Sequence, residues 1–105
     1  MAFQGTNAAL AWVHHNSSNT IADSFGISSV SRYGTGNYQI FFSVAAPNDN
    51  YVAVAGASSN KDSNGVYMSD AWPDATTSYY VYTHWTNGTA YDLTHNFSIV
   101  FGDKY

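Results

Sequence analysis

The chain of 105 residues contains no cysteine and no glutamate, and only three of its residues are lysine or arginine. Without cysteine, neither disulfide bonds nor thiolate metal sites can form. The three cations, Arg32, Lys61 and Lys104, are too few and too scattered to neutralise the series of phosphates that a nucleic-acid-binding surface contacts. We therefore expect no nucleic acid among the partners of this protein.

Charge and helix-forming residues are also scarce. Charged residues make up 10% of the chain, with a formal net charge of −4, whereas a typical soluble domain has about 25%. Leucine occurs only as Leu10 and Leu93, and with glutamate absent the chain lacks residues that favour long helices. No apolar run approaches the roughly 20 residues of a membrane span, so no membrane insertion is expected. The length suits one domain over residues 1–105, with residues 1–7 as a flexible N-terminal arm.

The chain has instead a period-two alternation of side chains, interrupted by clusters of turn-forming residues. Six or seven short antiparallel strands at this spacing predict an all-β fold, a single β-sandwich that is jelly-roll-like or a partly closed barrel. The predicted strands are residues 9–14, 27–33, 38–44, 51–56, 66–68, 79–85 and 93–101.

Turn signals suggest how these strands pair. The sequence Pro47-Asn-Asp-Asn is expected to join residues 38–44 and 51–56 as a hairpin. Asn87-Gly88 is the dipeptide that tight hairpins prefer, so it is expected to pair residues 79–85 with 93–101. Pro73 has no amide hydrogen, which excludes its segment from the centre of a sheet. Residues 58–65 form the most polar stretch and are predicted to be a long loop.

Aromatic residues are abundant, at 17% of the chain. The expected core includes Phe42, Phe97 and Phe101, but the remaining rings are too many for one small core. Surplus tyrosine and tryptophan suit a subunit interface, where they are enriched, or stacking on sugar rings. The candidate binding residues, for an interface or a glycan, are Trp72, Tyr79, Tyr80, Tyr82, His84, Trp85 and Tyr91.

Strand edges are a further unusual feature. Natural sheets blunt their open edges with lysine, proline or inward-pointing charge, but this chain has only two lysines and two prolines. We therefore expect further copies of the chain to cover its edges, because symmetric assembly buries the same patch on each copy.

Residue patterns for catalysis or metal binding are weak. His14 and His15 are adjacent, so a strand directs them to opposite faces. His84 and His95 could face each other if Asn87-Gly88 pairs their strands, but two histidines are fewer than the three protein ligands of a catalytic zinc site. No Gly-x-Ser-x-Gly nucleophile motif is present. We therefore predict no catalytic residues, no metal and no cofactor, and a protein that is not an enzyme.

Four segments resemble a domain common in structural proteins of tailed phages. They are Ala11-Trp-Val-His-His, Asp23-Ser-Phe-Gly-Ile-Ser-Ser-Val, Gly34-Thr-Gly-Asn-Tyr-Gln-Ile-Phe-Phe and Pro47-Asn-Asp-Asn-Tyr-Val-Ala-Val-Ala-Gly. The closing Ile99-Val-Phe-Gly is similar to the end of that domain. The resemblance covers residues 11–57 and the C-terminal end, while residues 58–94 match only in pattern. His15 stands where the family usually has phenylalanine, and Asn37 where it has aspartate.

The resemblance implies a β-rich domain in a virion, in a family whose members are usually homotrimers. It implies a non-enzymatic subunit on the particle surface, either a capsid decoration or a short appendage or fibre subunit, with other capsid or tail proteins as partners. The short chain favours this reading, because a full tail fibre also needs an attachment segment and a shaft. One alternative is a receptor-binding tail-fibre tip that recognises host surface glycan through Trp72 and Trp85. A second alternative is a free carbohydrate-binding module.

Overall fold

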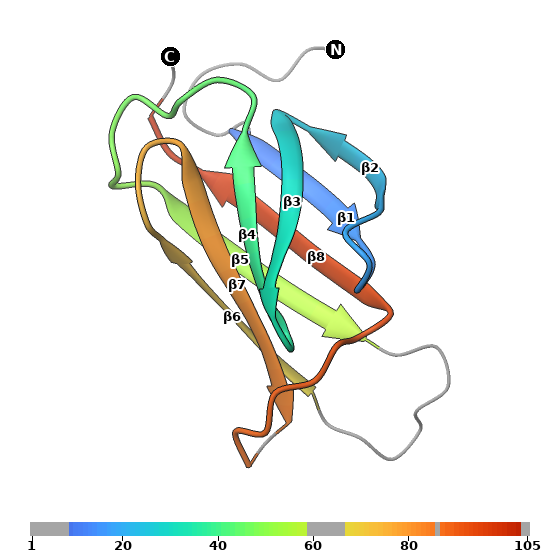
Figure 1. The fold of residues 1–105 in the computed structure, drawn as a ribbon. Helices are drawn as coiled ribbons and strands as arrows, with labels where there is room; N and C mark the ends of the chain where they lie inside the picture. The colour runs from blue at the N-terminus through green and yellow to red at the C-terminus, as the bar shows by residue number, and fades with distance from the viewer. Residues whose placement is uncertain (1–8, 59–66, 86, 104–105) are drawn as a thin grey trace.

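Two antiparallel four-stranded sheets lie face to face in the computed structural model, which describes residues 9–58, 67–85 and 87–103 (Figure 1). Sheet A has the order β2 (Ile21–Phe25), β1 (Ala11–His15), β8 (His95–Phe101) and β5 (Val52–Ser58). Sheet B has the order β3 (Ile27–Gly34), β4 (Asn37–Phe42), β7 (Ser78–Trp85) and β6 (Tyr67–Pro73). The predicted all-β sandwich is confirmed, with eight strands among the described residues in place of six or seven.

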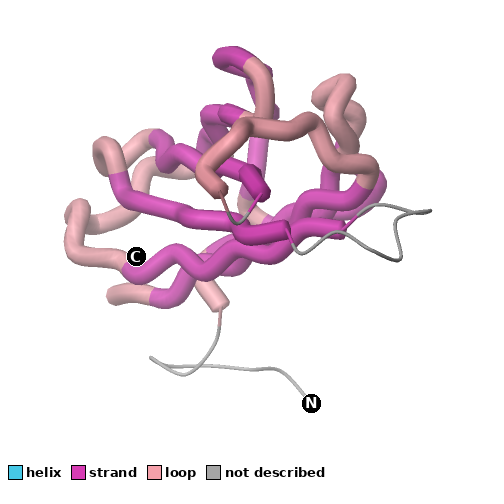
Figure 2. Tube along the Cα trace, turned by 90° about the horizontal axis from the view of Figure 1, so that it is seen from below, coloured by secondary structure: helices cyan, strands magenta, loops and turns pink. Residues whose placement is uncertain are grey.

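The layers consist of strands and their connections, and Figure 2 shows no helix in the part of the chain that the structure describes. Correspondingly, none of the described residues forms a helix able to cross a membrane. The expected N-terminal arm (1–7) and most of the predicted loop at 58–65 lie outside the described residues.

The core lies between the two sheets and follows the alternation of side chains. In β4, Tyr38, Ile40 and Phe42 point inward and are buried, as the pattern predicts. Tyr79 and Val81 of β7 meet them from the neighbouring strand, and both are fully buried. Val13 and Val100 supply the corresponding side chains from sheet A.

The side chains of β8 face the opposite way from the one expected. Its inward face carries Asn96, Ser98 and Val100, all buried, while Phe97 and Phe101 point outward and are 43% and 39% exposed. The prediction that Phe97 and Phe101 belong to the core is therefore wrong. Two inward polar groups have partners there: the Ser98 hydroxyl hydrogen-bonds the phenol of Tyr79, and the Asn96 side-chain amide donates to the Leu93 carbonyl oxygen at 3.0 Å. A strand with apolar residues on both faces does not by itself reveal which face is inside.

The predicted hairpin across Pro47-Asn-Asp-Asn is also wrong. Strand β4 lies in sheet B and β5 lies in sheet A, so the connecting segment crosses between the layers. Its two ends are tied to the β6–β7 turn, because the Ala46 amide donates to the Thr76 carbonyl (2.7 Å) and the Tyr51 hydroxyl donates to the Ala75 carbonyl (2.8 Å). The partner of β5 is β8, paired along its whole length.

The Asn87-Gly88 turn forms, but it does not join β7 to β8. Gly88 has a φ of +86°, and its amide donates to the Trp85 carbonyl (2.9 Å). The returning chain pairs with β7 only at Ala90, opposite His84, and then leaves for the other sheet. Strands β7 and β8 consequently lie in different sheets, which separates His84 from His95.

The sheet edges account for Pro73 and for the strand that the sequence pattern missed. Pro73 is the last residue of β6, an edge strand, where a missing amide hydrogen is tolerated, as predicted. Strand β2 was not predicted, because its residues Ile21–Phe25 mix small, acidic and aromatic side chains without clear alternation. Strand β2 forms one edge of sheet A, beside β1.

Candidate binding faces

The outer surface of sheet A is apolar. In an antiparallel sheet, residues directly opposite each other share a face, and the register aligns Phe25 with Trp12, Trp12 with Ile99, and Ile99 with Val54. These four side chains form an apolar row across all four strands, and all of them point away from the core. The apolar face is the set Trp12, His14, Phe25, Val52, Val54, Phe97, Ile99 and Phe101.

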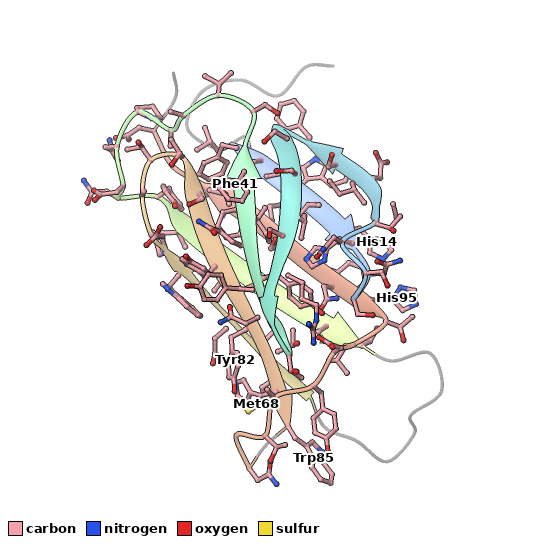
Figure 3. The ribbon with its side chains drawn as sticks, in the orientation of Figure 1. His14, Phe41, Met68, Tyr82, Trp85 and His95 are labelled. Carbon is pink, nitrogen blue, oxygen red and sulfur yellow. The ribbon has the colours of Figure 1, made fainter. Side chains whose placement is uncertain are left out.

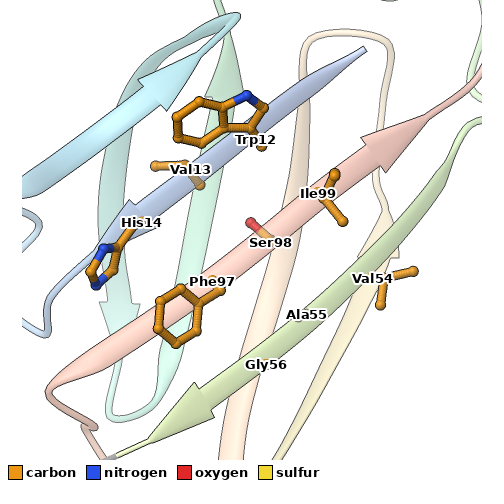
Figure 4. A pocket seen from close by; sticks show the side chains of 9 residues that line it. All are labelled: Trp12, Val13, His14, Val54, Ala55, Gly56, Phe97, Ser98 and Ile99. Carbon is orange, nitrogen blue, oxygen red and sulfur yellow. The ribbon is translucent and has the colours of Figure 1, made fainter. Parts of the chain in front are cut away.

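A groove of about 560 Å³ runs over the middle of the apolar face. Figure 4 shows the side chains of Trp12, Phe97, Ile99 and Val54 around it. Gly56 lies opposite Phe97 in the register, and a Cβ atom there would meet no other atom within 4 Å. The missing side chain of Gly56 thus leaves room beside the Phe97 ring. The full lining is Trp12, Val13, His14, Val54, Ala55, Gly56, Phe97, Ser98 and Ile99.

Two histidines meet at one end of the apolar face. His14 Nε2 lies 3.1 Å from His95 Nδ1, which is the distance of a hydrogen bond between the rings. Both rings also pack against Phe97, with centroid separations of 4.6 Å for His14 and 6.3 Å for His95. The expected partner of His95 was His84, and the change follows from the separation of β7 and β8. No group of three metal-ligating side chains occurs among the described residues.

The outer surface of sheet B carries aromatic rings together with polar groups. Trp72 of β6 stacks on Tyr80 of β7 with ring centroids 5.5 Å apart and planes inclined by 18°. Tyr33 of β3 approaches Tyr80 edge-on at 5.8 Å. Trp72 is 41% exposed and Tyr33 is 70% exposed, so rings in this row remain accessible to solvent. The aromatic face is the set Tyr33, Gln39, Asp70, Trp72, Tyr80, Tyr82 and His84.

A charged pair lies beside this row. His84 Nε2 is 2.9 Å from Asp70 Oδ2, and His84 Nδ1 is 2.9 Å from the Trp85 carbonyl oxygen. Both ring nitrogens therefore face acceptors, which suits the imidazolium form. The Trp85 carbonyl and then the Asp70 carboxylate raise the pKa of His84. The Tyr82 ring stacks on His84 at 4.9 Å and favours the same cationic form.

Of the candidate binding residues, four come together on the aromatic face: Trp72, Tyr80, Tyr82 and His84. Tyr79 does not belong with them, because it points into the core and is fully buried. Trp85 and Tyr91 form a separate edge-on pair at 6.0 Å near the Asn87-Gly88 turn. Tyr79 alternates with Tyr80 along β7, so a strand cannot present both to the same side.

Sequence reasoning missed the contribution of Tyr33 and the whole apolar face. Tyr33 is distant in sequence from the other rings of the aromatic face and reaches them only through the β3–β4–β7 pairing. A signal for the apolar face was present, because Trp12 alternates with the small apolar residues Ala11 and Val13, which fit a core. Comparisons with models of protein families, with curated proteins and with solved structures found no match.

Proposed function

We propose that this chain is a non-enzymatic structural protein of a tailed-phage particle, a homotrimeric capsid decoration or short appendage subunit whose apolar face is covered by further copies. The observation that carries the proposal is the row of Phe25, Trp12, Ile99 and Val54, which crosses the outside of sheet A. The placement in a virion and the trimeric state come from the resemblance in residues 11–57.

The size of the apolar face supports assembly. Four strands about 4.8 Å apart and about six residues long cover roughly 400 Å² of sheet. The largest apolar patch of a typical monomer has about this size and is often functional. A standard interface buries about 800 Å² per partner, so the face supplies about half. The edge of β2, which borders the face, can supply part of the rest, whereas β5 lies alongside β6.

The charge distribution favours identical copies over a charged partner. Among the described residues, Asp23 is the one carboxylate whose register places it on this side of sheet A, opposite His14. No described lysine or arginine belongs to the face. Two or three copies can therefore bring these surfaces together with little like-charge repulsion.

The assembly proposal is tested by light scattering on the purified chain at micromolar concentration. A homotrimer has a mass of about 34 kDa, three times the 11.4 kDa of the chain. Phe97→Ser and Val54→Ser should lower this mass, because each replaces an exposed apolar side chain of the face with a polar one. The matched control is Tyr33→Ser on the aromatic face, which should leave the mass unchanged. A wild-type monomer, or a trimer unaffected by Phe97→Ser, would refute assembly through this face.

The virion placement is tested separately. Mass spectrometry of purified phage particles should detect the chain, and cryo-electron microscopy should locate its density on the capsid lattice or at an appendage. Absence of the chain from purified particles would overturn the virion proposal without touching the assembly result.

A second candidate function is recognition of host surface glycan, as a receptor-binding tip. The stacked Trp72 and Tyr80 on the aromatic face favour it, because exposed rings beside hydrogen-bonding groups suit sugars. A free carbohydrate-binding module would use the same surface.

A further inference from the structure

We propose that the aromatic face is a binding site for neutral pyranose sugars, with Trp72 as the main stacking platform and Asp70 as a hydrogen-bond acceptor beside it. This inference deepens the second candidate function and is independent of assembly through the apolar face. It names the ligand class, the contact residues and the kind of glycan that the site excludes.

The two outer faces of the sandwich differ in chemistry. The apolar face is lined by hydrocarbon and offers the His14–His95 pair at one end. The aromatic face places carboxylate, imidazole, amide and phenol groups next to its rings. A pyranose has a C–H-rich face that packs on an aromatic ring and hydroxyl groups around its rim that need donors and acceptors. The aromatic face matches both requirements, whereas the apolar face matches only the first.

Contacts within the protein hold the Trp72 platform in place before any ligand arrives. Trp72 and Tyr80 are direct cross-strand partners in the β6–β7 ladder, and Tyr80 is also the partner of Gln39 in β4. The Gln39 amide donates to the Ser78 hydroxyl at 3.1 Å, which ties the Gln39 side chain to β7. Side chains that are already ordered lose little conformational entropy on binding. A row of rings results, in which Trp72 and Tyr80 lie nearly parallel and Tyr33 stands nearly perpendicular to Tyr80.

The charged groups beside the rings determine which class of sugar the aromatic face can bind. Asp70 is exposed, with 61% of its side chain accessible, and its register places it beside Tyr82. Partial desolvation raises the pKa of Tyr80, and so does Asp74, which directly follows Pro73 at the end of β6. The pairing of Asp70 with His84 leaves Asp74 as the carboxylate whose charge repels uronic acids and sulfated sugars near the rings. The face therefore favours neutral hexoses over acidic polysaccharides.

The aromatic face is well separated from the apolar face. The aromatic face belongs to sheet B and the apolar face belongs to sheet A, so they lie on opposite outer surfaces of the sandwich. In Figure 3, Tyr82 and Met68 lie over the β6–β7 side of the molecule, while His14 and His95 lie on β1 and β8. Copies that bury the apolar face would leave the aromatic face available to a ligand.

The experiment uses the purified full chain on an array of neutral oligosaccharides, built from glucose, galactose, mannose and N-acetylglucosamine units, with heparin and polyuronate as acidic probes. The best neutral probe is then titrated by calorimetry. Trp72→Ala should weaken its binding at least tenfold, and Trp72→Phe should restore part of the loss because it keeps a ring. Trp85→Ala is the matched control, because Trp85 is 38% exposed but lies outside the face, and it should bind like the wild type.

Each other outcome overturns the inference. It fails if no neutral probe binds, if acidic probes bind more strongly, or if Trp72→Ala binds like the wild type. Equal losses from Trp85→Ala and Trp72→Ala would place the site elsewhere. Circular dichroism verifies that each variant is folded, and Tyr33→Ala provides a second variant on the most exposed ring, with an expected loss of at least threefold. Light scattering on the same samples separates the two proposals. A monomer that binds sugar refutes the assembly proposal and leaves the sugar-binding proposal in place.

Discussion

The hydroxyl of Tyr79 lies 2.7 Å from the hydroxyl of Ser98, and this hydrogen bond joins sheet B to sheet A through the core. Both residues are buried, Tyr79 completely. Burial raises the pKa of Tyr79 to about 12, so the phenol stays protonated at any pH that the protein normally meets. The polar inward side of β8 thus provides a specific contact between the layers.

Replacing Tyr79 with phenylalanine should destabilise the fold. Tyr79→Phe leaves the buried Ser98 hydroxyl without this partner, and we expect the free energy of unfolding to fall by about 1–2 kcal/mol. The measurement is urea denaturation followed by tryptophan fluorescence. Tyr79→Phe combined with Ser98→Ala should cost less than the two single changes added together, because no polar group then remains unpaired. Simple additivity would show that the hydroxyls do not interact.

Asp92 connects the β3–β4 turn to the chain that follows the Asn87-Gly88 turn. Its carboxylate accepts hydrogen bonds from Arg32 Nη2 (2.8 Å), the Gly36 amide (2.8 Å) and the Tyr38 hydroxyl (3.0 Å). Replacing Asp92 with alanine leaves the partly buried Gly36 and Tyr38 donors without it. We expect a loss of about 1–3 kcal/mol in urea denaturation, and a much smaller loss for the exposed control Asp23→Asn.

Asp92 also predicts a pH effect. Its hydrogen bond with Arg32, followed by those with Gly36 and Tyr38, holds the pKa of Asp92 below the ordinary value of 3.8. The folded state therefore binds this proton less readily than the unfolded state. The resulting stabilisation is complete above pH 3.8 and is lost as the pH falls through the lowered folded pKa. Asp92→Asn should flatten the decline of the melting temperature below pH 4, and an unchanged acid profile would contradict this.

Gly36 should tolerate no side chain. Its φ is +66°, and a Cβ atom would overlap the Thr83 carbonyl oxygen and lie 2.7 Å from the Tyr91 carbonyl oxygen. Gly36→Ala should destabilise the protein by more than about 2 kcal/mol, because left-handed strain of about 1–2 kcal/mol adds to the clash. Gly88 has a similar φ of +86° but open space around it. Gly88→Ala therefore measures the backbone strain without the clash. Equal losses at the two positions would show that close approach at Gly36 is unimportant.

His15 and His84 make the stability of the fold depend on pH in opposite directions. The His15 ring is 1% exposed and packs edge-on against Tyr38 at 4.9 Å. Burial lowers its pKa below 6.5, only partly opposed by the hydrogen bond to the Asn16 carbonyl. The unfolded chain therefore binds this proton first, and stability is complete above pH 6.5 but falls as the pH drops toward the lowered folded pKa.

The test compares melting temperatures of the wild type and His15→Gln between pH 7.5 and pH 5. The variant should show a flatter decline toward acid, even if it is less stable at every pH. His84→Gln is the control, because its raised pKa gives stabilisation below pH 6.5 that is lost as the pH rises through the folded value. Removing His84 should therefore leave the acid decline in place, and a flattened profile there would contradict the assignment to His15.

Much of the secondary structure could be predicted, because alternation is local. Strand β4 follows its pattern residue by residue, and Asn87-Gly88 forms the turn that its composition favours. Which sheet receives the next strand was not predictable in this way. The segment after β4 and the segment after Asn87-Gly88 both cross to the other layer, and their turn residues do not record whether the chain returns to the same sheet.

The candidate binding residues that lie together belong to one strand, β7, or to its direct neighbour, β6. Tyr80, Tyr82 and His84 alternate along β7 and share its outer side, and Trp72 is the partner of Tyr80. Tyr33 was missed because its approach to Tyr80 depends on pairing through β4. The inward turn of Tyr79 could not be inferred, since tyrosines on both sides of β7 made either face a plausible core.

Strand β1 begins beside the end of β8, where the Leu10 amide donates to the Val100 carbonyl at 2.7 Å. A host protein could therefore carry residues 10–102 as an insertion in one of its surface loops, opening that loop by only the spacing of two neighbouring strands, about 5 Å. For the same reason the fold suits circular permutation, with a short linker from β8 to β1 and new termini at the exposed Asn87-Gly88 turn. Such permutants would offer attachment points at the opposite end of the domain.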